Sequence, residues 1–254
     1  MTGNSVFDFL LLAEFACAAF VIMVLFLVDA PYGRHKRAGW GPSINTRLGW
    51  IIMESPAALC FLYFFCIGQN ARSIVPILLL LMWQLHYFHR AFIYPFLIKV
   101  KEGDKTPFAI LAPGALFCGI NGFLNGAYVS NYATYLNNEW LTDPRFIIGV
   151  ILFGFGYYLN KHSDKMLRDL RAQSSDEYKI PYGFGFKLVS MPNYLGEIVT
   201  WTGFAIASWS LAGLAFVVFT MANLVPRAIA NHKWYQAHFA EYPKDRKAII
   251  PFVL

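Results

Sequence analysis

Long apolar stretches separated by short polar segments make up most of the chain. A membrane-spanning helix needs about 20 mostly apolar residues. Stretches of this kind lie at roughly 6–28, 48–68, 74–98, 107–129 and 145–160. The apolar region at about 188–225 is too long for one span at ~1.5 Å per residue, and Ser208-Trp209-Ser210 interrupts it, so we divide it into 188–208 and 210–226. The pattern predicts an all-α polytopic membrane protein, with seven transmembrane helices in a single domain, 1–254.

The basic residues support seven spans rather than six. Loops on the cytoplasmic side of a membrane carry an excess of Lys and Arg. Seven spans place 18 of the 21 Lys and Arg residues on one side and only two on the other, whereas six spans give 13 against seven. The 18 lie in 30–47, 99–106, 161–195 and the tail after 225. The count predicts a multi-pass protein with a cytoplasmic C-terminus.

Composition agrees with a membrane protein and excludes several other classes. Hydrophobic residues make up 57% of the chain and charged residues 14%, against about 25% charged in soluble domains. Although the net charge is +6, the basic residues lie between apolar runs and form no patch, which argues against nucleic-acid binding. The four cysteines have no paired spacing, so we expect neither a metal site nor a disulfide framework. The first apolar run is interpreted as a span, not a cleaved signal.

Two predicted spans carry polar side chains that are energetically unfavourable in lipid. A charged group at the bilayer centre costs at least about 2.5–3.5 kcal/mol, so such groups are functional candidates. Glu54 lies two residues before Pro56, where a kinked helix could form the wall of a site; the alternative is a carboxylate that faces water or pairs with an arginine. Tyr87, Arg90 and Tyr94 share one face of an ideal helix, either as part of a site or as a structural hydrogen-bonding stripe.

Further polar rows lie at the cytoplasmic side. If the fifth helix continues past its span, Asn160, Asp164, Arg168 and Arg171 share a face suited to a phosphorylated ribose, because arginine binds phosphate bidentately. A solvated helix with ion pairs is the alternative. Two more rows follow, Asn193 with Glu197 and then Arg227, Asn231 and Tyr235. Three rows on one side indicate a large polar ligand from the cytosol, while the glycines at 154–156 and 183–185 lack the context of a dinucleotide fold.

Several motifs together resemble the steroid 5α-reductase (3-oxo-5α-steroid 4-dehydrogenase) family over almost the whole chain. The segments that carry the resemblance are Pro31-Tyr32-Gly33, Glu54-Ser55-Pro56, His86-Tyr87-Phe88-His89-Arg90, Asn160-Lys161-His162-Ser163-Asp164, Asn193-Tyr194-Leu195-Gly196-Glu197 and the long stretch from Glu241 to Phe252. Two positions depart from the pattern. Met53 stands where well-known members have glutamine, and Asn231 lies where relatives have a histidine-rich run, which bears on substrate preference.

The resemblance implies seven helices around an intramembrane cavity, with NADPH entering from the cytosol and a steroid from the lipid. It assigns Glu54 and Tyr87 to the steroid 3-keto oxygen. The positions it associates with the cofactor are Asn160, Asp164, Arg171, Tyr178, Asn193, Glu197, Arg227 and Tyr235, and Arg168 joins them on the helical-face argument. The positions expected to line the steroid pocket are Trp50, Met53, Phe117, Phe216, Phe219 and Leu224.

The reaction implied by this resemblance is reduction of the Δ4 double bond of a 3-oxo-Δ4 steroid, with hydride delivered to C5. Rival interpretations are a related membrane sterol or enoyl reductase, an isoprenylcysteine-type methyltransferase and, with no repeat to support it, a transporter. We expect membrane lipids as neighbours and no obligate protein partner. The membrane would be the endoplasmic reticulum in a eukaryote or the inner membrane in a bacterium.

Overall fold

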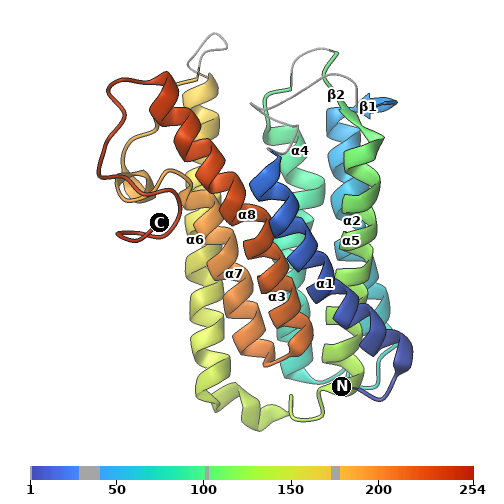
Figure 1. Ribbon diagram of the computed structural model, residues 1–254. Helices are drawn as coiled ribbons and strands as arrows, with labels where there is room; N and C mark the ends of the chain where they lie inside the picture. The colour runs from blue at the N-terminus through green and yellow to red at the C-terminus, as the bar shows by residue number, and fades with distance from the viewer. Residues whose placement is uncertain (1, 29–40, 101–102, 173–177) are drawn as a thin grey trace.

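A computed structural model describes residues 2–28, 41–100, 103–172 and 178–254. Within these ranges the long helices run side by side as one bundle (Figure 1). They are α1 (Ser5–Leu27), α2 (Thr46–Cys66), α3 (Ile74–Phe88), α5 (Phe108–Ala127), α6 (Pro144–Ala172), α7 (Pro192–Ser208) and α8 (Leu211–His238). The motif Pro31-Tyr32-Gly33 and the basic residues Arg34, Lys36, Arg37 and Lys101 lie outside the described residues.

The all-α membrane class is confirmed. Four helical segments of the described chain are long and apolar enough to cross a membrane, namely α1, α2, α5 with its extension to Tyr132, and α8. Helix α3 continues through a π-helical turn (His89–Ile93) into the short α4 (Tyr94–Leu97), so this region is helical from 74 to 97. The other three predicted spans also overlap helices, but only the four segments above are long and apolar enough to cross a membrane.

The helix ends differ from the predicted span ends in informative ways. The break at Ser208-Trp209-Ser210 is present, because Trp209 adopts φ +45° and ends α7 while the Ser210 hydroxyl accepts from the Gly213 amide at 2.9 Å and caps α8. Helix α6 runs on to Ala172 and α8 to His238, well past their apolar parts. Helix α7 begins at Pro192, after a 3₁₀ turn (Phe184–Lys187), and not at 188.

Short elements absent from the helical prediction close the bundle ends. The strands β1 (Ser43–Asn45) and β2 (Lys105–Pro107) pair antiparallel, with Ile44 opposite Thr106. 3₁₀ (Asn138–Thr142) and π (Tyr128–Tyr132) turns connect α5 to α6. The Asn45 side chain accepts from the amides of Arg47 and Leu48, so the last residue of β1 also caps α2.

Helices α6 and α7 approach each other closely because each helix presents a glycine to the backbone of the other. A Cβ atom at Gly156 would meet the backbone of Thr200, and one at Gly196 would meet the backbone of Asn160. Small residues allow this close approach of two helix backbones. Gly156 is therefore a packing glycine, and the contact brings the polar parts of both helices together.

An aromatic core fills the centre of the bundle. Trp83 of α3 packs between Phe61 of α2 and Trp201 of α7, with ring centroids 4.7 Å and 5.2 Å away. The Trp83 indole donates to the carbonyl of Ala57 at 2.9 Å, so its one polar group is satisfied. One polar side chain nearer the periphery is not: Glu14 of α1 is 4% exposed, and neither carboxyl oxygen has a hydrogen-bond partner among the described residues.

Candidate active site

Glu54 lies on α2 inside the core and contacts an arginine of the next helix. Its Oε1 atom is 3.2 Å from Nε of Arg90, and its Oε2 atom is 4.0 Å from the Cys118 sulfur of α5. The Arg90 guanidinium also covers the Trp50 ring at 4.8 Å and the Tyr94 ring at 5.4 Å. Pairing with an arginine was one of the two alternatives that the sequence left open, and it fixes the orientation of a buried carboxyl group.

The π-helical turn at His89–Ile93 separates the polar side chains of this region into two directions. Arg90 and Tyr94 both contact Trp50, whereas Tyr87 packs against Trp201 at 5.4 Å and Phe216 at 6.4 Å. The common face expected for Tyr87, Arg90 and Tyr94 assumes a regular α-helix, and the wider π turn alters that register. Tyr87 is 4% exposed and belongs to the same core cluster as Cys118, the neighbour of Glu54.

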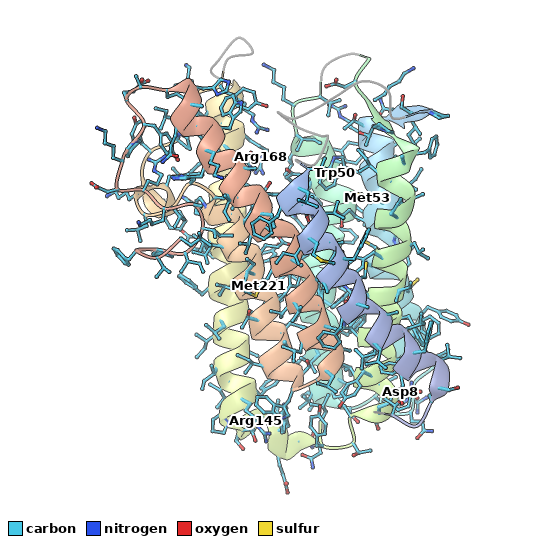
Figure 2. All side chains as sticks on the ribbon, in the orientation of Figure 1. Asp8, Trp50, Met53, Arg145, Arg168 and Met221 are labelled. Atoms are coloured by element: carbon cyan, nitrogen blue, oxygen red, sulfur yellow. The ribbon has the colours of Figure 1, made fainter. Side chains whose placement is uncertain are left out.

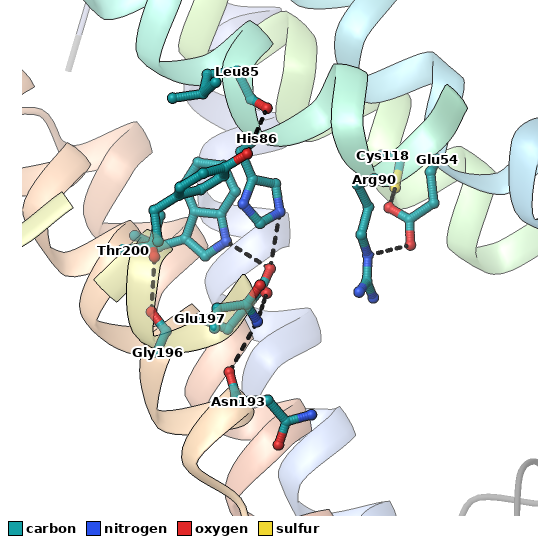
Figure 3. Close-up of polar contacts among 12 residues, drawn as sticks. Glu54, Leu85, His86, Arg90, Cys118, Asn193, Gly196, Glu197 and Thr200 are labelled. Atoms are coloured by element: carbon teal, nitrogen blue, oxygen red, sulfur yellow. Dashed lines mark hydrogen bonds and ion pairs between the residues drawn. The ribbon is translucent and has the colours of Figure 1, made fainter. Parts of the chain in front are cut away.

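A second carboxylate, Glu197 of α7, has a side chain only 14% exposed and is held by three donors (Figure 3). His86 Nε2 lies 3.1 Å and Trp201 Nε1 3.2 Å from its Oε1 atom, and Asn160 Nδ2 lies 2.9 Å from its Oε2 atom. Asn160 Nδ2 also donates to the carbonyl of Asn193 at 2.9 Å. Because the partners come from α3, α6 and α7, this cluster joins three helices around one carboxylate.

The cluster extends along the contact of α6 and α7. The side-chain amide of Asn193 donates to Oδ1 of Asp164 at 2.9 Å. Two of the predicted polar rows therefore meet in one network, which consists of Asn160, Asp164, Asn193 and Glu197. Four buried polar atoms beside it have no partner among the described residues: Asn160 Oδ1, Ser163 Oγ, Arg168 Nη1 and Asn193 Oδ1. Since buried polar groups are normally hydrogen-bonded, these atoms fit a polar ligand that supplies both donors and acceptors.

The remaining predicted cofactor residues lie toward the same end of the bundle in separate contacts. Arg227 of α8 donates to the Tyr194 hydroxyl at 3.1 Å. Arg171 covers the Tyr178 ring at 5.8 Å, at the end of α6. Tyr235 is 2% exposed and stacks on Tyr242 at 5.3 Å. Asn231, one turn before Tyr235, is also buried.

The predicted pocket residues surround the other side of the core. Phe117 of α5 stacks on Phe219 at 3.6 Å and contacts Phe216 at 6.2 Å. Met53 lies against Gly114, where a Cβ atom would meet its side chain, and Leu224 is half-buried farther along α8. Figure 2 places Trp50 and Met53 in the same half of the molecule as Arg168, with Arg145 at the opposite end.

An apolar hollow of about 380 Å³ lies elsewhere, along α5 beside Phe64, and none of the candidate residues lines it. Its lining residues include Leu116, which is 66% exposed. The hollow is thus a feature of the outer, lipid-directed surface and is not the central cavity that the resemblance implies.

Of the partners of the two carboxyl groups, the sequence predicts only Asn160 as a site residue and offers pairing with an arginine as an alternative for Glu54. It does not identify His86, Trp201 or Cys118 as partners. The intramembrane histidine was a usable signal, since a buried imidazole needs a partner. The spacing of Glu197 and Trp201, four residues apart on one helix, was a second signal.

Comparison with known proteins agrees with the resemblance. A family model described as 3-oxo-5-alpha-steroid 4-dehydrogenase matches residues 104–254. The chain is 42% identical over 250 residues to the steroid 5-alpha-reductase DET2 of Arabidopsis thaliana, covering 96% of this chain and 95% of that protein. It is 41% identical over 250 residues to the 3-oxo-5-alpha-steroid 4-dehydrogenase 1 of Bos taurus, covering 96% of each.

The fold is an apolar helical bundle, and its core holds carboxyl groups beside a polar cluster. Together with the enzyme names of these relatives, it identifies the protein as a membrane oxidoreductase. The chain belongs to the 3-oxo-5-alpha-steroid 4-dehydrogenase family. The family and the enzyme class expected from the motifs are confirmed, and the family implies a nicotinamide cofactor in general terms.

Proposed function

We propose that this protein uses NADPH to reduce the Δ4 double bond of 3-oxo-Δ4 steroids to 5α-reduced 3-oxo steroids. The observation that carries the proposal is Glu54, a buried carboxyl group held at 3.2 Å by Arg90 in the same core as Tyr87. The names of the relatives, one a steroid 5-alpha-reductase and another a 3-oxo-5-alpha-steroid 4-dehydrogenase, support the substrate class.

The polar network of α6 and α7 is the proposed binding region for NADPH. Its unpartnered atoms include two amide oxygens that could accept hydrogen bonds and the Arg168 guanidinium that could bind phosphate. Arg171, Tyr178, Arg227 and Tyr235 lie toward the same end and would contact other parts of an extended ligand. When bound, NADPH would supply the hydride that adds to C5 of the steroid, and a proton taken from water at C4 would complete the reduction.

The proposed catalytic residues act on the C3 oxygen, where negative charge develops as the enone is reduced. The Tyr87 hydroxyl would donate one hydrogen bond to this oxygen. Protonated Glu54 would donate another through Oε2 while Oε1 still accepts from Arg90 Nε. Donors aimed at developing charge stabilise the transition state more than the ground state, and losing one costs ~10²–10³ in rate. Trp50, Met53, Phe117, Phe216, Phe219 and Leu224 would line the steroid.

The proposal includes a membrane topology. Seven spans around a steroid cavity, with a cytoplasmic C-terminus, follow from the distribution of Lys and Arg. The steroid would enter from the lipid and NADPH from the cytosol, in the endoplasmic reticulum of a eukaryote or the inner membrane of a bacterium. Cysteine labelling in sealed vesicles, at positions introduced near Arg145 and near the C-terminus, would show whether these two ends lie on opposite sides.

The test uses Glu54→Gln and Tyr87→Phe in purified protein supplied with NADPH and testosterone. We expect each variant to lose at least tenfold in kcat, because each loses a donor to the C3 oxygen. Tyr157→Phe is the matched control, since within the described part of the chain the Tyr157 hydroxyl hydrogen-bonds only to the carbonyl of Leu85, at 3.5 Å, and its loss should leave kcat unchanged. Near wild-type turnover by both site variants would overturn the assignment of these residues.

A further inference from the structure

Gly114 of α5 leaves room for the side chain of Met53 on α2. A Cβ atom at Gly114 would lie 2.8 Å from both Cγ and Sδ of Met53. Among the described residues outside its own helical turn, it would meet nothing else within 4 Å. Because carbon atoms in contact prefer about 3.5–4.0 Å, the Met53 side chain would have to move by about 1 Å. The glycine is therefore needed for this one side chain.

The contact at Gly114 differs from the closest glycine contacts farther along α5. A Cβ atom at Gly122 or Gly126 would meet backbone oxygens of α2, at 2.8 Å and 2.6 Å. A methyl group at those two positions would push the helices apart. At Gly114 it would meet an unbranched side chain with three rotatable bonds, so Met53 would turn while the helices stay in place.

Neighbouring contacts determine the direction of that movement. At ~100° per residue, Met53 points between the directions of Gly49 and Trp50 on α2. The Gly49 direction is closed, because a Cβ atom at Gly49 would meet the Leu111 side chain of α5 at 2.9 Å. A methyl group at Gly114 would therefore push the Met53 side chain in the direction of Trp50.

The Trp50 direction leads to the proposed steroid site. The Arg90 guanidinium covers the Trp50 ring at 4.8 Å and holds Glu54 Oε1 at 3.2 Å, so these side chains lie together between the helices. The Arg90 side chain is 25% exposed, and Trp50 and Met53 are half-buried, whereas Trp83 of the aromatic core is 0% exposed. This part of the bundle is thus less densely filled than the aromatic core, and Met53 can turn into it.

We propose that Gly114 is a positioning residue that sets the width of the steroid pocket through Met53. With glycine at this position, the Met53 thioether lies back against α5 and leaves the space beside Glu54 to the steroid. A side chain at position 114 would turn Met53 into that space. One methylene group more or less in an apolar pocket changes discrimination by about 10–200-fold. This inference rests on the proposed function for the identity of the ligand.

Kinetics and equilibrium binding of testosterone to purified Gly114→Ala, with NADPH present, test the proposal. We expect KM and Kd for the steroid to rise about tenfold, because Met53 occupies part of the pocket. The kcat value should stay unchanged, since both donors to the C3 oxygen remain.

The same change in a Met53→Ala background completes a double-mutant cycle, which isolates the effect of the pair. Gly114→Ala should there leave KM and Kd for the steroid unchanged, because no long side chain remains for the methyl group to push. An equal rise in KM with and without the Met53 side chain would overturn the proposal. So would a matching loss of NADPH affinity in Gly114→Ala, because it would show general damage to α5.

Gly119→Ala is the matched control on the same helix. A Cβ atom at Gly119 would make only ordinary contacts, with Cys60 Sγ and Pro56 Cβ at 3.8 Å, so the steroid KM should not change. An unchanged steroid Kd in Gly114→Ala would overturn the positioning role alone. A wild-type protein that neither binds nor reduces testosterone would overturn the proposed function and this inference with it.

Discussion

The carboxylate of Glu197 makes the most quantitative prediction, because its three donors come from three helices. In Glu197→Leu, His86 Nε2 and Trp201 Nε1 each lose their partner, whereas Asn160 Nδ2 keeps the carbonyl of Asn193. An unsatisfied buried donor costs about 1–3 kcal/mol. Two such donors predict a loss of ~2–6 kcal/mol in the free energy of unfolding.

Glu197→Gln should cost less and for a different reason. Its remaining carbonyl oxygen can still accept from His86 and Trp201, which both bind the same carboxylate oxygen. The new amide group would instead face the Asn160 amide nitrogen, donor against donor, at a cost of about 1–3 kcal/mol. The predicted order of stability is therefore wild type, then Gln, then Leu.

Reversible unfolding in mixed detergent micelles, followed by far-ultraviolet circular dichroism, measures these differences. Asp169→Asn is the matched control, because Asp169 pairs with Lys165 one turn away on an exposed face of α6, where such a pair contributes only about 0.2–0.5 kcal/mol. If Glu197→Leu lost no more stability than this control, the three contacts would not be holding the helices together as described.

Three further changes test other contacts of the bundle. Arg90→Ala leaves the buried Oε1 atom of Glu54 without its donor and should destabilise the protein by about 1–3 kcal/mol. Gly196→Ala forces a methyl group against the backbone of Asn160 and should cost about 1–3 kcal/mol in the same unfolding assay. Glu14→Leu replaces a buried carboxyl group that has no partner among the described residues. It should raise the free energy of unfolding by about 1–3 kcal/mol and therefore raise the melting temperature.

Each of these predictions has an outcome that contradicts it. Arg145→Ala is the control for Arg90, since Arg145 also pairs with a carboxylate and covers two aromatic rings, but its side chain is 40% exposed against 25% for Arg90, and its loss should cost less stability. Equal losses from Arg90→Ala and Arg145→Ala would show that burial of the pair is unimportant. An unchanged melting temperature in Gly196→Ala, or a lower one in Glu14→Leu, would contradict the packing described at those sites.

The helices and their break were predictable because lipid demands one simple pattern. Long apolar runs located every long helix, and the polar interruption around Trp209 correctly separated α7 from α8. The helix ends were not predictable from hydropathy alone. Helices α6 and α8 continue beyond their apolar parts because polar side chains such as Asn160 and Tyr235 find partners there.

The candidate site was only partly predictable, for a geometric reason. The i, i+4 relation grouped Asn160 with Asp164 and Asn193 with Glu197, since residues four apart share a helix face. Nothing in the sequence fixes which helix lies opposite, so the pairing of Glu54 with Arg90 and of Glu197 with His86 emerged only from the packing. A helical wheel assumes a constant angle per residue, so it also could not predict the π-helical turn after Phe88.

The central claim, NADPH-dependent reduction of a 3-oxo-Δ4 steroid, is tested most directly by following the transferred hydrogen. Purified protein would be incubated with testosterone and NADPH deuterated at its transferable position, and the product analysed by mass spectrometry and NMR. We predict a 5α-reduced 3-oxo steroid with one deuterium at C5 and one equivalent of NADPH consumed. Deuterium at another carbon, a 5β product, or unreduced steroid with intact NADPH would contradict the account.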